Sequence, residues 1–160
     1  MAQIIKSLSE LNNAMDRYCK FAVDKMADVA KAKIEEFIRY YYEEYPSPEE
    51  YQRTWAFLNS VLKTEPKKVG NGWEVIVYID TDYMYASTAY YEDGTPYRRE
   101  RWSMLDTAKS ANDGWHGYTV QIGDGIHFWD DAVEEIKEKQ LISNAFVKFM
   151  KEKGLNVTYK

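Results

Sequence analysis

The stretch RYYYEEYPSPEEYQRTW, residues 39–55, marks the point at which one helix must end and another can begin. Pro46 disfavours helical geometry at Tyr45, so a helix that arrives from the N-terminal side stops before this proline. Ser47, Pro48 and the two glutamates that follow are typical of a helix start, because serine caps the helix, proline suits its first position and carboxylates favour its positive end. The sequence therefore predicts an elbow between two helices.

The segment before this elbow has the pattern of one long amphipathic helix. Ser7 and Glu10 fit a capping box at its start. A helix that runs from there to about Glu44 would be about 57 Å long, too long for a small domain to cover, so one end should project or pack on another copy. The apolar positions recur at three- and four-residue steps, at Ile4, Leu8, Leu11, Met15, Cys19, Ala22, Met26, Val29, Phe37 and Tyr41. The charged residues that fall largely on the other side are Asp16, Lys20, Asp24, Lys31 and Glu35.

The residues after the elbow predict a second, shorter helix and then two strands. The helix would begin at Pro48, and Pro66 with Gly70-Asn71-Gly72 would end it. Its apolar face consists of Tyr51, Trp55, Leu58 and Leu62. WEVIVYID (73–80) and YMYASTAYY (83–91) are rich in β-branched and aromatic residues, so they predict the two strands of an antiparallel hairpin.

The remainder of the chain completes an α+β pattern. Residues 92–125 mix turn signals with scattered glycines, so we interpret them as an insertion or long loop. Apolar spacing over Trp129–Lys153 predicts a long C-terminal helix that Gly154 can end, and LNVTY (155–159) alternates as a last strand. We therefore expect one α+β domain over residues 1–160. It would have a long N-terminal helix, a short second helix, an antiparallel sheet of hairpin plus C-terminal strand, and the C-terminal helix packed on that sheet.

Composition narrows the class of protein. Hydrophobic residues make up 45% and charged residues 29%, as in ordinary soluble domains. No stretch has the roughly 18 apolar residues of a membrane span, the N-terminus lacks the pattern of a secretory signal, and the single Cys19 cannot form an internal disulfide. The net charge of −5 argues against general nucleic-acid binding, which needs a concentrated positive field. We expect no membrane contact, no sequence-specific nucleic-acid binding and a cytoplasmic location.

Catalytic and metal-binding patterns do not stand out. His116 and His127, with Asp124 and the Asp130-Asp131 pair nearby, are the only candidates for metal ligands. The two histidines are eleven residues apart across glycines, unlike the fixed helical spacing of zinc sites, and the aspartate pair suits a helix start. No Ser-His-Asp order, phosphate-binding glycine loop or carboxylate pair is evident. We expect no enzyme, no cofactor and no metal.

Aromatic and arginine clusters are the better candidates for a functional surface. Three consecutive tyrosines on a helix cannot all face one direction, and tyrosine is enriched at protein interfaces. Arginines beside aromatic residues can bind carboxylate or phosphate groups, although such a charge run can also be an ordinary solvated face. The overall acidity favours contact with protein. The candidate interface residues are Tyr40, Tyr41, Tyr42, Tyr45, Arg53, Arg98, Arg99, Arg101 and Trp102.

The chain resembles the small tail-completion and head-tail joining proteins of long-tailed bacteriophages and Gram-positive prophages, often labelled minor capsid or tail components. The matching segments are YYEEYPSPEEYQRTWAFLNSV (41–61), WEVIVYID (73–80), GWHG (114–117) and FWDDAVEEIK (128–137). YRRERW (97–102) has no counterpart in that pattern.

This resemblance implies a non-enzymatic structural protein of the virion, assembled in the host cytoplasm. It would form an oligomeric ring with copies of itself and with other head-tail or tail proteins, around the DNA passage at the head-tail junction or at the tail end. The alternatives are a small nucleic-acid-processing enzyme or toxin-like ribonuclease that uses His116, His127 and the Arg98–Arg101 cluster, and a host-directed binding module of a mobile element.

Overall fold

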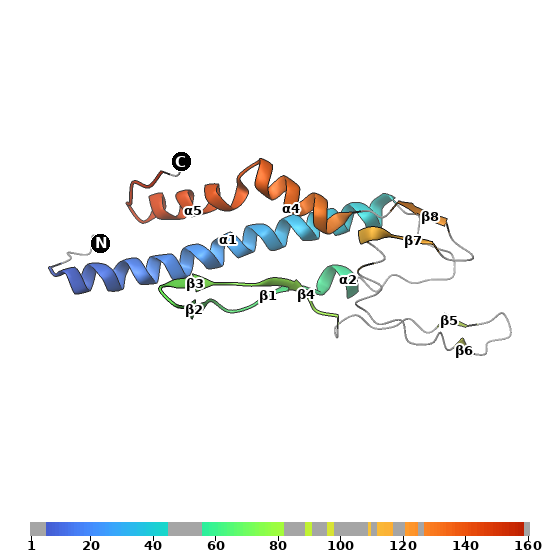
Figure 1. The fold of residues 1–160 in the computed structure, drawn as a ribbon, viewed down its shortest axis with the longest axis horizontal. Coiled ribbons are helices and arrows are strands. Elements are labelled where there is room, and N and C mark those ends of the chain that lie inside the picture. The colour runs from blue at the N-terminus through green and yellow to red at the C-terminus, as the bar shows by residue number, and fades with distance from the viewer. Residues whose placement is uncertain are drawn as a thin grey trace.

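One long helix organises the structure, which is a computed structural model that describes residues 6–44, 56–81, 89–90, 96–97, 109, 112–116, 121–124 and 127–158. This helix, α1 (Leu8–Glu44), has a β-hairpin along one side and two C-terminal helices along another (Figure 1). Helices and antiparallel strands therefore pack together, and the α+β class is confirmed.

The predicted bounds of α1 are confirmed. The Ser7 hydroxyl accepts the Glu10 backbone N–H at 3.1 Å, as in a capping box, while the Glu10 carboxylate accepts the Lys6 backbone N–H at 2.7 Å. The helix continues for 37 residues to Glu44, about 55 Å at 1.5 Å per residue. Its first turns extend beyond the hairpin at the N-terminal end of the molecule (Figure 1).

The hairpin lies earlier in the chain than predicted. Strand β1 (Val61–Lys63) pairs antiparallel with β4 (Val77–Ile79), and β2 (Lys67–Val69) pairs antiparallel with β3 (Gly72–Glu74). The described strands within 73–80 therefore pair with the segment before them, whereas of 83–91 the structure describes only Ala89–Tyr90, which pair with 96–97. The turn is made by Gly70 and Asn71, and Gly70 has a φ of 57°, a conformation that favours glycine. The sequence pattern instead predicts a helix end at Gly70-Asn71-Gly72, and this prediction is wrong.

The second helix ends earlier than predicted. α2 spans Ala56–Asn59 in the described part of the chain, and β1 begins at Val61, so Leu62 belongs to a strand and Pro66 lies in the bend between β1 and β2. Proline has no backbone N–H to donate to a ladder, which suits a bend of this kind. The predicted start of this helix at Pro48 lies outside the described residues.

The C-terminal helix is in fact two helices. α4 (Phe128–Glu138) and α5 (Leu141–Glu152) meet at Gln140, which has a left-handed φ of 51°. The prediction of a last strand at 155–159 is also wrong, because residues 155–158 form no strand. Leu155 and Val157 instead pack with Tyr18 and Cys19 of α1. The alternating pattern there reflects contact with a helix, not pairing in a sheet.

The core consists of two clusters along α1. The larger cluster joins α1, α2, β1 and α4, and its buried members are Ile34, Ile38, Phe57, Val61, Phe128 and Ala132. The smaller joins α1 to α5 through Ala22, Phe149 and Met150. α4 therefore shares one core with the hairpin, whereas the buried residues of α5 pack mainly on α1.

Among the described residues in and beside the region interpreted as an insertion, 92–125, the structure shows two short antiparallel pairs. β5 (Ala89–Tyr90) pairs with β6 (Pro96–Tyr97), and β7 (Gly114–His116) pairs with β8 (Gln121–Asp124). Among the helices that the structure describes, none is long and apolar enough to cross a bilayer.

Candidate interaction surfaces

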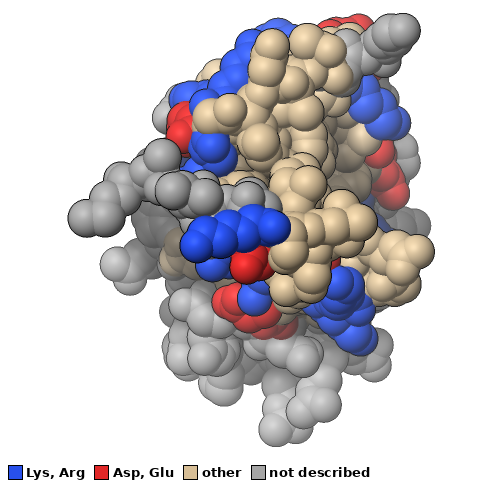
Figure 2. Space-filling model, turned by 90° about the vertical axis from the view of Figure 1, so that its left-hand side faces the viewer, with Lys and Arg blue, Asp and Glu red and all other residues tan. Residues whose placement is uncertain are grey.

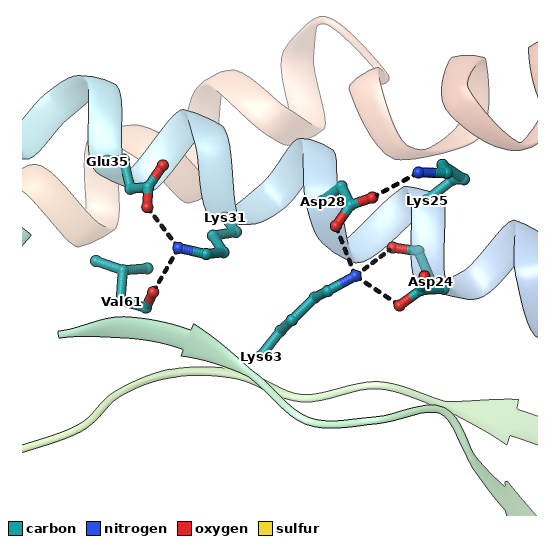
Figure 3. A network of polar contacts seen from close by, with 7 residues as sticks. All are labelled: Asp24, Lys25, Asp28, Lys31, Glu35, Val61 and Lys63. Carbon is teal, nitrogen blue, oxygen red and sulfur yellow. Dashed lines mark hydrogen bonds and ion pairs between the residues drawn. The ribbon is translucent and has the colours of Figure 1, made fainter. Parts of the chain in front are cut away.

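The charged side of α1 faces the hairpin. Lys63 on β1 extends to α1 and makes ion pairs of 2.5 Å with both Asp24 and Asp28 (Figure 3). One helical turn further on, Lys31 binds Glu35 at 2.5 Å and donates to the Val61 carbonyl oxygen at 2.6 Å. Asp24 and Lys31, which the sequence pattern placed on the side opposite the apolar stripe, therefore help to hold α1 and the hairpin together.

A second set of ion pairs joins α1 to α4. Lys33 lies 2.6 Å from Glu36 on its own helix and 2.9 Å from Glu135 on α4. Glu135 also pairs with Lys139 at 2.7 Å. The Tyr40 hydroxyl donates to Glu36 at 3.1 Å, so Tyr40 is connected through Glu36 and Lys33 to the seam between α1 and α4.

A third polar group lies at the hairpin turn. Asp16 of α1 accepts a hydrogen bond from the Trp73 indole at 3.1 Å and pairs with Lys68 at 2.6 Å. The ammonium groups of Lys20 and Lys68 lie 5.4 and 5.5 Å from the centre of the Trp73 ring, within range of cation–π attraction. Two cations therefore share one aromatic ring at this end of α1, and one of them, Lys68, also pairs with the Asp16 carboxylate.

These contacts shift several pKa values in consistent directions. Burial acts to raise the pKa of Asp28, but hydrogen bonds from Lys63 and Lys25 outweigh it and hold that pKa below 3.8. The hydrogen bond from Lys33 lowers the pKa of Glu36 below 4.5. Burial acts to lower the pKa of Lys63, yet its hydrogen bonds to Asp24 and Asp28 raise that pKa above 10.5. Each shift favours the charged form in the folded protein.

Stability is therefore expected to be lost in acid. A carboxyl group whose pKa is lower in the folded state than in the unfolded state stabilises the fold above its unfolded pKa, and this contribution disappears as pH falls through the folded value. For Asp28 and Glu36 the loss begins near their ordinary values of 3.8 and 4.5 and continues below them. Lys63 acts in the opposite sense, so its contribution is complete below pH 10.5 and is lost above that pH.

Urea unfolding of the wild type and of the Asp28→Asn variant from pH 7 to pH 3 measures this loss of stability in acid. The variant should be less stable at pH 7, and the two curves should converge toward pH 3 because the wild-type side chain becomes neutral too. Parallel curves over this range would contradict a linked role for the Asp28 carboxylate.

The structure describes only part of the predicted interface. Tyr40 is exposed near the end of α1, and its ring makes an edge contact with Phe37, with centroids 5.9 Å apart. Tyr41 and Tyr42 continue the helix backbone, but their side chains are not among those described. The remaining candidates, Tyr45, Arg53, Arg98, Arg99, Arg101 and Trp102, lie outside the described residues.

The two histidines occupy backbone positions of different kinds. His116 belongs to β7, opposite Gln121, and His127 precedes α4 with a left-handed φ of 45°. The His127 N–H donates to the Asn112 carbonyl oxygen at 2.9 Å, and the Asn112 side-chain oxygen accepts the Trp129 N–H at 2.9 Å. Asn112 thus caps the first turn of α4 from a distant part of the chain, a role that no local motif reveals.

Pockets and groups of metal-binding side chains are the usual features of a ligand site. A hollow of about 400 Å³ lies between β4 and the start of α4, and its walls include Val77, Ile79, Asn112 and Trp129. Within the described ranges, no group of three or more His, Cys, Asp or Glu side chains could hold a metal ion.

Large apolar side chains are also exposed at the N-terminal end of the molecule, where sequence analysis named no candidate residue. Leu8 is 73% exposed, Leu11 40% and Val69, beside the hairpin turn, 51%. Leu8 and Leu11 continue the apolar stripe of α1 that α5 covers further along. The sequence signal was the projecting helix itself, which predicted an uncovered end without saying which end.

Comparison with known proteins gives one match. No curated protein and no solved structure matches the chain. The model of the YomN family matches residues 3–152, and YomN is the name of a protein of a Bacillus prophage of the SPBc2 type, which is consistent with a phage origin. Since the match covers nearly the whole sequence, the chain belongs to the YomN family.

Proposed function

We propose that the protein is a structural component of a phage or prophage particle, located at the head-tail junction or the tail end. The observation that carries this proposal is the YomN family match, because its name comes from a prophage. The resemblance of residues 41–61, 73–80, 114–117 and 128–137 to head-tail joining proteins supports the more specific position.

The proposed mechanism is interface formation. The protein forms an oligomeric ring with neighbouring virion proteins and needs no catalytic group to do so. Ring closure requires two different surfaces on each subunit. A helix held by ion pairs and apolar clusters to the hairpin and to the C-terminal helices can present such surfaces at fixed separation, because these partners immobilise it. The tyrosines near the elbow and the arginines of 98–101 remain candidate contacts.

Particle composition tests this function. After induction of a prophage that encodes the protein, an immunoblot of purified particles should detect it, and deletion of its gene should leave filled heads without attached or complete tails. Tyr42→Ala and Arg99→Glu should reduce incorporation while changing the stability of the purified monomer by less than about 0.5 kcal/mol. Particles that lack the protein and assemble normally without it would reject the proposal.

A further inference from the structure

One end of the molecule combines exposed apolar side chains with an excess of positive charge. This basic end comprises residues 6–21, 65–76 and 146–158, which contribute the start of α1, the hairpin turn and the end of α5 (Figure 1). It contains eight Lys and Arg against five Asp and Glu, a net charge of +3 in a chain whose net charge is −5. Viewed from this end, the surface shows a broad area of other residues bordered by Lys and Arg side chains, with Asp and Glu among them (Figure 2).

The apolar part of the basic end includes Leu8, Leu11 and Val69. They lie on two different elements, α1 and β2, that the Asp16 contacts to Lys68 and Trp73 hold together. Leu8 and Leu11 lie on the first turns of α1, which extend beyond the hairpin, and Val69 lies beside the hairpin turn (Figure 1). Exposed apolar area that is bordered by charged side chains is typical of protein contact sites. Because the surrounding charge is positive, the surface that fits here is acidic.

Such an acidic surface occurs on the same chain. The outer side of α4 carries four exposed carboxylates, those of Asp130, Asp131, Glu134 and Glu138. Tyr40 lies at the neighbouring seam between α1 and α4, with an exposed ring fixed by its hydrogen bond to Glu36. This acidic side therefore also offers apolar area, and it uses one of the tyrosines that the sequence had indicated as an interface residue.

We propose that the basic end of one copy docks on the acidic side of α4 in a second copy. The contact is heterologous, because the two copies use different surfaces, so it can repeat into a ring or a row. The opposite charges of the two surfaces favour this pairing over basic end to basic end or α4 to α4, where like charges meet. This contact rests on the proposed function in one respect, because the ring proposed there requires a heterologous contact between copies.

Reversing the charges on each side tests the pairing. The basic-end variant carries Lys6→Glu with Lys67→Glu, and the α4 variant carries Glu134→Lys with Glu138→Lys. All four residues are exposed, and the ion pairs described above involve none of their side chains. Sedimentation velocity should show self-association of the wild type that weakens as salt rises, because exposed charges are screened. Each variant alone should associate at least about tenfold more weakly.

A mixture of the two variants gives the decisive result. In an equimolar mixture the unchanged basic end of one variant can meet the unchanged α4 side of the other, and the introduced glutamates can meet the introduced lysines, so association should return toward the wild-type level with the variants alternating. Leu8→Ser should weaken association of the wild type without removing its salt dependence. A wild type that stays monomeric at all concentrations, variants that associate like the wild type, or a mixture that stays monomeric would each overturn this contact.

Particle incorporation separates this inference from the proposed function. If the protein is present in particles but the variant mixture does not associate, the function stands and this contact is wrong. If the protein is absent from particles while the mixture associates, the contact stands and the function is wrong. Thermal unfolding of both variants near that of the wild type controls for loss of fold.

Discussion

Replacing Phe128 by alanine is expected to lower the free energy of unfolding by about 3–5 kcal/mol, the range for truncating a buried aromatic side chain. Phe128 is only 1% exposed, and its ring packs edge-on against Phe57 with centroids 5.1 Å apart. It is the first residue of α4 and belongs to the cluster that includes Ile38 and Val61. Its loss therefore weakens the one core that joins α1, α2, the hairpin and α4.

Urea unfolding followed by circular dichroism measures this effect, and Phe21→Ala is the matched control. Phe21 lies on α1 and is 49% exposed, so the same truncation there should lower the free energy by less than about 1 kcal/mol. A typical domain has only about 5–15 kcal/mol in total, so the Phe128 variant should be near the limit of folding. Equal effects at the two positions would mean that the larger cluster is not the main core.

The second large effect is expected at Lys63, where methionine should lower the free energy of unfolding by about 1–3 kcal/mol. The Lys63 ammonium group pairs with two carboxylates at once, those of Asp24 and Asp28. Replacing it leaves these two negative charges close together without the positive charge between them. The pairs are partly exposed, so the loss should fall between the roughly 0–1 kcal/mol of surface pairs and the 3–5 kcal/mol of buried ones. Lys25→Met removes only the exposed pair with Asp28 and should change stability by less than about 0.5 kcal/mol.

A double-mutant cycle separates the ion pair from its neighbours. Adding Asp24→Asn to Lys63→Met removes one of the stranded charges, so the double variant should be more stable than the sum of the two single effects predicts. Chemical unfolding of all four proteins gives this coupling energy. Strict additivity would show that Lys63 contributes through the packing of its side-chain carbons and not through Asp24.

The long helix was predictable because its signals are local. The cap at Ser7, the apolar steps along its length and the proline after Glu44 each act within a few residues. The hairpin was displaced because Leu62 continued a helical spacing and Gly70-Asn71 resembled a helix end. Only the pairing of β1 with β4 decides that 61–63 is a strand, and pairing is not visible in one segment alone.

The contacts of the charged side of α1 could not be predicted for a different reason. Charged residues at Asp16, Asp24 and Lys31 favour a solvated face by pattern, because most charged faces are solvated. Here each has a partner from the hairpin, namely Lys68, Lys63 and the Val61 carbonyl oxygen. Those partners are separated from α1 in the sequence, so composition and periodicity carry no trace of the contact.

The break between α4 and α5 could not have been predicted from spacing. Apolar residues at Ile136 and Met150 are fourteen residues apart, close to four helical turns, so the stripe remains in phase across Gln140. The residue in the left-handed conformation is also not a glycine. Of the candidate interface residues, Tyr40 is the one whose side chain the structure describes, and it is exposed. The basic end was not predicted because its residues come from three separate segments, at the start of α1, the hairpin turn and the end of α5.

The arrangement of partners around α1 also sets an order of events during synthesis. The hairpin leaves the ribosome soon after the helix, whereas α4 and α5 follow only after residues 82–126 have been added. The nascent helix can thus form its ion pairs with the hairpin before Phe149 and Met150 have been synthesised to cover its apolar stripe. Exposed apolar surface on incomplete chains is where aggregation and chaperone binding begin. If a ribosome pauses before residue 128, the nascent chain has the hairpin but neither α4 nor α5. The uncovered apolar stripe of α1 is then the part most exposed to aggregation and chaperone binding.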